Sequence, residues 1–334
     1  MQEPHVDTSL SKPILPPASY AQSIEQENNS TELDKGFHSY IVVLNEKSGS
    51  ADCPTLQGFI EERAKELNKT VHFIHLKKGM DLETELKDAA ELVDAEVYVG
   101  AGGDGTLAAV AGSARRHNKV FAGIPCGTAN VFAKEHNIPK DAKAAAEMAL
   151  TSTQVSPVDI LDVAGRIFLC HISIGTYSWI TVHTNHELKR KYGRIAYMFN
   201  AIKLMMKERI FRFDITIDGK KIQRKASTIM VTNAGSMGMT TMRWGENIAT
   251  DDGIAEICIF KARTLGHYFA LLVSFILRKP HKHLKEYHKV YDTATITGNK
   301  RLPVRADGEE IADGGFTFKI IKHGLRVILP ETKH

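Results

Sequence analysis

Short apolar segments alternate with amphipathic segments of helical length between residues 39 and 150, and this alternation limits the fold more than any other feature. The strand-length segments are 39–44, 71–76, 96–100 and 120–124. The helical ones are 55–68, 82–93, a segment that follows the loop at 102–106 and runs to about 116, 128–136 and 140–150. Strands that alternate with helices of this length pair in parallel and are covered by the helices. The region therefore predicts an α/β domain built on a parallel sheet.

After about residue 152 strand-length segments often follow one another without a helix between them. They are 155–163, 167–174, 210–217, 227–232, 254–260, 293–296, 316–321 and 325–329. Only two helices are expected here, at about 180–207 and 265–277. This half predicts a second domain at residues 151–330, mainly an antiparallel β-sandwich or barrel.

Residues 1–36 differ from both halves. They hold six acids against two lysines, together with several prolines and no apolar period. Such a composition buries too little apolar surface to offset the entropy that is lost on ordering. We expect a disordered acidic tail here, which leaves residues 37–150 for the α/β domain.

The composition also excludes several classes of protein. No apolar run reaches the roughly 18–20 residues of a membrane-spanning helix, and the N-terminus lacks the basic and apolar regions of a signal peptide. The four cysteines stand far apart without metal-ligand spacing, at Cys53, Cys126, Cys170 and Cys258. We expect a cytoplasmic chain with reduced thiols.

The sharpest motif in the chain is the loop Gly102-Gly103-Asp104-Gly105-Thr106, which follows a predicted strand and opens a predicted helix. Glycines let the backbone approach an anion closely, and N–H groups at a helix N-terminus favour phosphate. Since a carboxylate would repel phosphate, Asp104 is expected to handle a metal ion or a proton. The alternative is a tight turn in which Asp104 caps its own helix.

Two further loops follow strands of the same predicted sheet. One contains Gly127, Thr128 and Asn130, and the other contains Asn45, Ser48 and Gly49. Loops at the carboxyl ends of neighbouring parallel strands face one crevice, where such sheets bind ligands. A plain turn explains the 123–130 loop equally well. The chain has no Walker-type phosphate loop, and the looser dinucleotide pattern from Gly103 lacks its acidic partner.

Five motifs occur in an order that resembles a known family. They are Asn45-x-x-Ser48-Gly49, the Gly102–Thr106 loop, Gly127-Thr128-x-Asn130, Asp251-Asp252-Gly253 and Ala306-Asp307-Gly308-Glu309. Together they resemble the diacylglycerol kinase catalytic-domain family, which includes bacterial lipid kinases and, more distantly, sphingosine kinases. The resemblance runs from about residue 39 to 330. The glycine loop alone is shared with NAD kinases and 6-phosphofructokinases.

The resemblance implies a role for each matching residue. Residues that would bind ATP and its phosphates are Asn45, Ser48, Gly49, Gly102, Gly103, Asp104, Gly105, Thr106, Gly127, Thr128 and Asn130. Glu309 would be the general base, and Asp104 would act beside it in catalysis. The implied fold is an α/β domain like that of NAD kinases and diacylglycerol kinases, followed by the β-sandwich.

The same resemblance implies two metal sites. Asp252, with the backbone carbonyls of Ala249 and Ile254, would bind a structural cation. Asp104 and Asp159 would hold a water–Mg²⁺ network. From the residues alone, Asp159 is equally well explained as a strand acid that faces solvent, and residues 251–253 as a hairpin turn.

The chain departs from the family pattern at two positions. Glu46 stands where a proline is usual, which would loosen a turn. Val131 stands where many members carry an acid of the metal network, and a valine side chain cannot ligate a metal. Sphingosine-kinase relatives also lack this acid, so the assignment stands.

The expected function is an ATP-dependent, Mg²⁺-requiring lipid kinase for a diacylglycerol-like or sphingoid hydroxyl. Residues 186–225 carry twelve Lys and Arg against four acids, a face that would attract anionic headgroups at a membrane surface. A merely solvated surface is the alternative, and nucleic acid binding is not expected. The sequence leaves a homodimer open, as it does an NAD kinase-like activity and a lipid-binding pseudokinase, the last suggested only by Val131.

Overall fold

The computed structural model describes residues 36–45, 53–77, 79–178, 210–238, 242–245, 247–277, 281 and 283–330. Several features expected from the sequence lie outside these ranges. They are Ser48, Gly49, the helix at 180–207, most of the basic residues of 186–225 and nearly all of the acidic tail.

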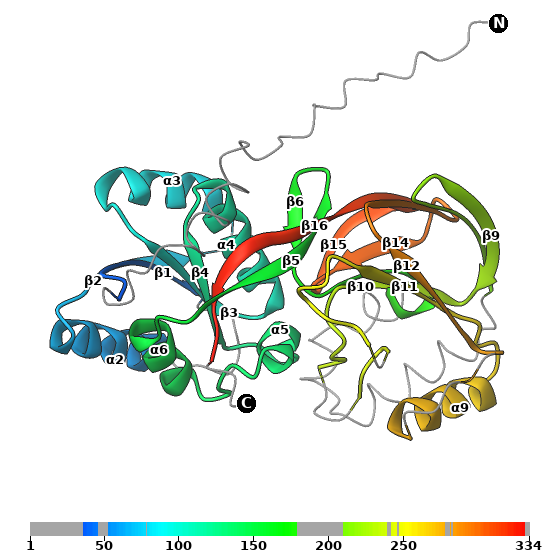
Figure 1. The fold of residues 1–334 in the computed structure, drawn as a ribbon, viewed down its shortest axis with the longest axis horizontal. Helices are drawn as coiled ribbons and strands as arrows, with labels where there is room; N and C mark the ends of the chain where they lie inside the picture. The colour runs from blue at the N-terminus through cyan, green and yellow to red at the C-terminus, as the bar shows by residue number, and fades with distance from the viewer. Residues whose placement is uncertain are drawn as a thin grey trace, which may run out of the picture.

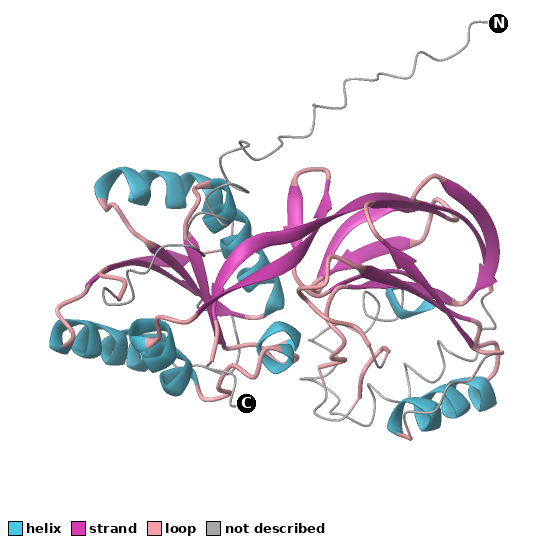
Figure 2. Cartoon of the chain, in the orientation of Figure 1, coloured by secondary structure: helices cyan, strands magenta, loops and turns pink. Residues whose placement is uncertain are grey.

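The N-terminal part contains the expected parallel sheet, flanked by helices on both faces (Figure 2). Its strands have the order β2-β1-β3-β4, with bounds β1 (Ser39–Asn45), β2 (Thr70–Leu76), β3 (Val97–Gly102) and β4 (Val120–Pro125). Its helices are α2 (Cys53–Glu66), α3 (Leu82–Leu92), α4 (Asp104–Arg116), α5 (Val131–Glu135) and α6 (Ala142–Thr151). Every residue of β3 and β4 is buried, because helices cover both faces of a parallel sheet.

The register of this sheet aligns the ends of its strands. Leu44 pairs with Ala101, and Gly102 pairs with Pro125. The loops that follow β1, β3 and β4 therefore leave the sheet side by side along one edge.

The second part is a sandwich of antiparallel strands, as expected. One sheet has the order β12-β11-β10-β7-β14-β15, and the facing layer contains β5, β8, β9, β13 and β16. The bounds are β5 (Val155–Val163), β6 (Arg166–Phe168), β7 (His171–Gly175), β8 (Phe211–Ile217), β9 (Lys220–Ala226), β10 (Thr228–Thr232), β11 (Ala255–Phe260), α9 (Leu265–Ile276), β12 (Lys285–Val290), β13 (Thr293–Thr297), β14 (Pro303–Ala306), β15 (Glu309–Asp313) and β16 (Gly315–Ile328). Ile172, Ile229 and Ile257 of the first sheet pack against Phe213, Ile296 and Phe318 of the facing layer.

The strands β9, β12, β14 and β15 were not expected from the sequence, and the single strand expected at 167–174 is two strands, β6 and β7. The separate strands expected at 316–321 and 325–329 are one strand, β16. Its register shifts between Ile321 and Leu325, where His323 has a φ of 50°. This bulge lets one continuous strand bend while its pairing with β5 continues on both sides.

Strand β16 joins the two parts of the molecule (Figure 1). Its first residues pair antiparallel with β13 of the sandwich, and Val327 pairs in parallel with Phe121 of β4. Strand β5 runs along it over most of this length. The two parts therefore share a hydrogen-bonded sheet. Within the described residues, no helix combines the length and apolar character that crossing a bilayer requires.

We predict that Leu325→Ala lowers the free energy of unfolding by about 2–5 kcal/mol, because it removes most of a completely buried side chain where β16 enters the α/β core. Urea denaturation measures the change. Lys319→Ala, on the exposed side of the same strand, is the control and should shift stability by no more than about 0.5 kcal/mol. Equal effects of the two variants would contradict the structural role assigned to β16.

Candidate active site

Three loops meet at the carboxyl edge of the parallel sheet. The Nδ2 of Asn45, at the end of β1, donates a hydrogen bond of 2.8 Å to Oγ1 of Thr106 in the glycine loop. Thr106 is buried and packs closely on Gly102, where a Cβ atom would lie 2.6 Å from that of Thr106. Asn45, Gly102 and Thr106 thus form one rigid corner at the start of α4.

The glycine loop and the loop after β4 touch through their backbones. A Cβ atom at Gly127 would lie 2.6 Å from Cα of Gly103, so only glycine fits there. The Asn130 side chain closes this second loop by accepting from the Gly127 N–H and donating to its carbonyl, both at 2.9 Å. A plain turn requires neither the contact between Gly127 and Gly103 nor the two hydrogen bonds of Asn130. Thr128 lies at the exposed tip of the loop.

Asp104 is the first residue of α4, and the helix is capped by Gly103. The alternative in which Asp104 caps its own helix is therefore wrong. Its Oδ1 instead accepts a hydrogen bond of 3.1 Å from the N–H of Phe132, at the start of α5. Burial and, after it, the negative charge of Asp307 raise the pKa of the Asp104 carboxyl.

Asp307 is a site residue that the sequence analysis did not assign. It lies in the turn between β14 and β15, is 3% exposed, and accepts backbone hydrogen bonds from Leu169, Cys170 and His171 at 2.6–3.1 Å. Burial raises the pKa of Asp307 to about 6 in spite of these bonds, with a further contribution from Glu309. The available signal was its place beside Glu309 in the C-terminal motif.

Glu309 begins β15 and lies directly over the glycine loop. A Cβ atom at Gly105 would be 3.0 Å from Oε1 of Glu309. The other carboxylate oxygen of Glu309 accepts a hydrogen bond of 2.8 Å from Nη2 of Arg166, in β6. The C-terminal motif of the sandwich thus reaches the start of α4. Nothing in the sequence indicated Arg166 as the partner of Glu309.

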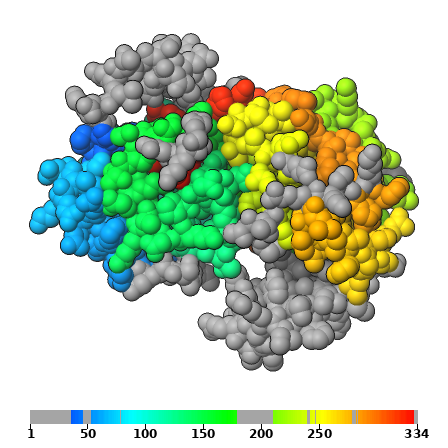
Figure 3. Space-filling view, turned by 60° about the horizontal axis from the view of Figure 1, so that its bottom comes forward, coloured from blue at the N-terminus to red at the C-terminus, as the bar shows by residue number. Residues whose placement is uncertain are grey.

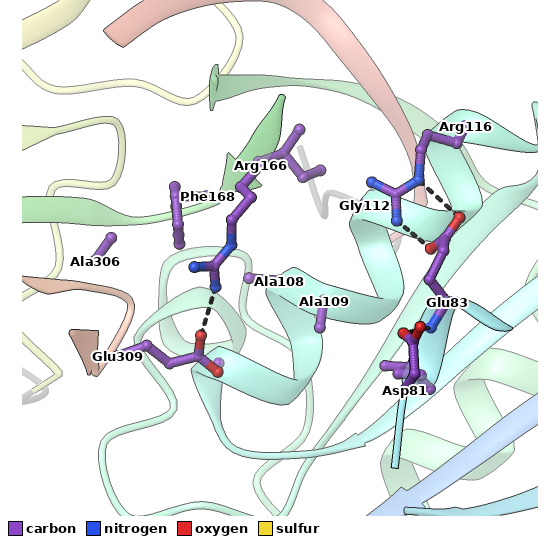
Figure 4. A pocket seen from close by; sticks show the side chains of 13 residues that line it. Asp81, Glu83, Ala108, Ala109, Gly112, Arg116, Arg166, Phe168, Ala306 and Glu309 are labelled. Atoms are coloured by element: carbon purple, nitrogen blue, oxygen red, sulfur yellow. Dashed lines mark hydrogen bonds and ion pairs between the residues drawn. The ribbon is translucent and has the colours of Figure 1, made fainter. Parts of the chain in front are cut away.

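A cleft opens beside this contact (Figure 4). It is lined by the start of α3, one face of α4, strand β6 and the ends of β14 and β15. Two ion pairs stand in it, Arg166 with Glu309 and Arg116 with Glu83. The small residues Gly105, Ala108, Ala109 and Gly112 leave the α4 face open.

Asp159 has a different setting from Asp104. It is completely buried in β5, so the alternative in which it faces solvent is wrong. Its two carboxylate oxygens accept hydrogen bonds of 2.6 Å from the N–H groups of Gly253 and His323. Asp159 thereby ties the 251–253 turn to the bulge of β16, and its role toward Mg²⁺ stays a prediction.

The 251–253 turn precedes β11. Asp252 is exposed, and its Oδ1 accepts a hydrogen bond of 2.9 Å from the N–H of Ile254. Gly253 has a φ of 74°, in the left-handed region that favours glycine. A turn fits this geometry, and the cation site with the carbonyls of Ala249 and Ile254 stays a prediction.

The carboxyls at the start of α4 fit Mg²⁺ only together with a phosphate ligand. After burial, the negative charge of Asp307 raises the pKa of Asp104, and a divalent cation would relieve that repulsion. No cluster of three or more Asp, Glu, His or Cys among the described residues could cage a metal alone. This suits Mg²⁺, which is commonly held by one or two carboxylates plus substrate phosphates.

Val131 is the position where the chain departs from the family pattern. Its side chain is 3% exposed and belongs to the core of the α/β part. It also packs near Gly238, where a Cβ atom would lie 3.3 Å from Cγ2 of Val131. The valine therefore fills an apolar position instead of offering a ligand.

Comparison with known proteins agrees with this geometry. The model of the diacylglycerol kinase catalytic domain matches residues 39–163, and that of the YegS C-terminal NAD kinase beta sandwich-like domain matches residues 170–329. The chain belongs to the diacylglycerol kinase catalytic-domain family. The two matches follow each other along the chain and divide it between the α/β part and the sandwich.

Relatives are similar at low identity over most of their length. A diacylglycerol kinase of Bacillus subtilis (strain 168) is 26% identical over 257 residues, covering 75% of this chain and 83% of the relative. One of Staphylococcus carnosus (strain TM300) is 25% identical over 261 residues, covering 76% and 83%. A crystal structure of a diacylglycerol kinase from Bacillus anthracis str. Sterne has a TM-score of 0.69 at 23% identity, covering 89% of this chain and 98% of that one. That likeness supports the fold alone.

The raised pKa of Asp307 predicts a pH-dependent loss of stability. Below about pH 4 the carboxyl is protonated in both folded and unfolded chains. As the pH rises from about 4 to about 6 only the unfolded chain loses the proton, so the free energy of unfolding falls, and above that range the loss is complete.

We predict that Asp307→Asn removes this titration. The stability of the wild type relative to Asp307→Asn should fall by about 3 kcal/mol between about pH 4 and pH 7, at roughly 1.4 kcal/mol per unit of pKa difference. Urea denaturation at several pH values measures it, with the exposed Asp313→Asn as the control. A stability difference that does not vary with pH would contradict the predicted titration.

Proposed function

We propose that this chain is an ATP-dependent, Mg²⁺-requiring lipid kinase that transfers the γ-phosphate of ATP to a lipid hydroxyl. The contact between Glu309 and Gly105 supports this most. A carboxylate from the sandwich stands over the loop whose N–H groups and helix N-terminus are suited to phosphate. Membership of the diacylglycerol kinase catalytic-domain family and the names of the relatives point to the same activity.

In the proposed reaction each part of the site has one task. The backbone of the glycine loop and the loop at Thr128 bind the phosphates and orient the γ-phosphate. The oxygen of the lipid hydroxyl forms the new bond to the γ-phosphorus, and Glu309 accepts the proton of that hydroxyl. The bond between the γ-phosphorus and the bridging oxygen breaks, and ADP leaves with its electrons. Arg166 holds the Glu309 carboxylate in position through the 2.8 Å hydrogen bond.

Mg²⁺, when bound with the nucleotide, would neutralise phosphate charge, and Asp104 is the residue best placed to hold it. The Phe132 N–H fixes one oxygen of that carboxylate. Asp307 acts indirectly, because its three backbone hydrogen bonds position residues 169–171 and its charge raises the pKa of Asp104.

A turnover assay tests the activity. Purified full-length protein with radiolabelled ATP and Mg²⁺ is offered diacylglycerol, a sphingoid base and NAD in parallel. We expect label in a lipid product and none in NADP. Label in NADP would support an NAD kinase-like enzyme, and binding of lipid vesicles without transfer of label would support the pseudokinase that Val131 suggests.

We predict that Glu309→Gln lowers kcat by about 10²–10⁴, the usual scale for loss of a general base, while the Kd for ATP changes little. The amide keeps the size of the side chain but cannot take up the proton. Steady-state kinetics and calorimetric titration with ATP measure the two effects, with the exposed neighbour Glu310→Gln as the matched control. A large loss of ATP affinity with kcat unchanged would assign Glu309 to nucleotide binding.

A further inference from the structure

Helix α9 (Leu265–Ile276) carries large apolar side chains on both of its faces, and its sequence contains no Asp, Glu, Lys or Arg. One face is buried. Leu271 and Phe275 pack on the outer side of the six-stranded sheet, where the Phe275 ring lies 6.0 Å from that of Trp244 and 5.8 Å from that of Phe260. These contacts hold the helix against the sandwich.

The opposite face exposes large apolar side chains to solvent. Leu265, Phe269, Leu272 and Ile276 are 42%, 68%, 43% and 56% exposed. At about 100° per residue these four positions fall within about 60° of one another around the helix, so they form one stripe. With Leu277 they make up five of the nine large apolar side chains that are exposed among the described residues. This grouping differs from the scattered apolar residues of an ordinary surface.

The chain around this stripe is strongly basic. Residues 257–285 contain six Lys and Arg and no acid: Lys261, Arg263, Arg278, Lys279, Lys282 and Lys285. Arg263, directly before the helix, is exposed. The Lys285 ammonium lies 4.3 Å from the centre of the Phe275 ring, and Lys261 pairs with Glu286. An apolar stripe in a basic segment complements an anionic lipid bilayer, where anionic headgroups cover apolar acyl chains.

The position and length of α9 match an interfacial helix. Twelve residues span about 18 Å, too short to cross a bilayer but sufficient to lie along its surface. Figure 3 shows the helix, in gold, at the surface of the sandwich. Its buried side chains pack on β10 and β11 of the six-stranded sheet, and Glu309 lies in β15, the edge strand on the far side of that sheet.

We propose that the outer face of α9 docks the protein on an anionic lipid bilayer, with the stripe of Leu265, Phe269, Leu272 and Ile276 entering the interface. This deepens the proposed function, on which it rests, by giving the enzyme a route to a substrate that stays in the membrane. It is independent of the basic residues expected at 186–209, which lie outside the described residues.

The test replaces Phe269 and Ile276 together with serine and measures sedimentation with vesicles containing about one third phosphatidylglycerol in phosphatidylcholine. We expect the partition coefficient to fall on the order of ten- to a hundred-fold, because two exposed apolar side chains no longer enter the interface. The matched control replaces Leu92 and Tyr291, which are 78% and 63% exposed away from α9, and should bind as the wild type does. Equal binding by the α9 variant and the wild type would overturn the proposal.

A second variant, Arg263→Glu, tests the charge separately. It should weaken binding to anionic vesicles about ten-fold or less and leave binding to pure phosphatidylcholine unchanged, and the difference should fade at high salt. Unchanged binding to anionic vesicles would exclude a role for the basic segment at this face. Circular dichroism and thermal melting verify that each variant is folded.

Two further measurements separate this proposal from its alternatives. Transfer of label to a short-chain diacylglycerol dissolved in water should stay within about two-fold of wild type in the α9 variant, since the chemistry lies at Glu309. If no lipid is phosphorylated, the proposed function fails, whereas vesicle binding still decides the docking surface. If light scattering finds a wild-type dimer and a monomeric α9 variant whose vesicle binding is unchanged, the stripe is a homodimer interface instead.

Discussion

The pairing of β16 with both parts of the molecule is the constraint on which the site depends. The turn that carries Asp307 precedes β15, which begins with Glu309 and leads into β16. The end of β16 lies beside β4, whose own loop packs on the glycine loop. Glu309 is paired with Ala306 of β14, and the long ladder between β5 and β16 joins the sandwich to the α/β part. The distance between Glu309 and the glycine loop is therefore set by hydrogen-bonded strands instead of by a flexible linker.

The electrostatics of the site follow from this enforced proximity. Asp104, Asp307 and Glu309 come from different elements, and their negative charges gather around the start of α4. The protein offsets part of this charge with backbone N–H groups at Asp104 and Asp307 and with the Arg166 guanidinium at Glu309. Burial raises the pKa of both aspartates, and the neighbouring carboxylates add to it, Asp307 at Asp104 and Glu309 at Asp307. A cation and the N-terminal dipole of α4 are the natural complement to such a cluster when phosphates are present.

The outer surface of the sandwich shows a second consequence of the same architecture. The six-stranded sheet presents one face to the core and the other to α9, so a strongly apolar helix can be held without being fully buried. A lipid kinase needs both an enclosed place for phosphate transfer and contact with a lipid surface. In the proposed arrangement these two needs are met at opposite ends of one rigid sheet.

The sequence by itself determined the class of fold and most residues of the candidate site. The alternation of strands and helices in 39–150 comes from local periodicity. Close contacts, with the Thr106 side chain at Gly102 and with the Gly103 backbone at Gly127, require glycines that the motifs already contained. It could not show β9 or β12, because charged side chains alternate along these exposed strands and hide the apolar period, nor β14 and β15, which are short and flank a turn. Only the tertiary structure decided that Arg166 pairs with Glu309, that Asp307 holds residues 169–171, and that Asp159 faces the 251–253 turn. Those contacts join residues far apart in the chain, and their partners depend on how two sheets pack, which no local pattern encodes.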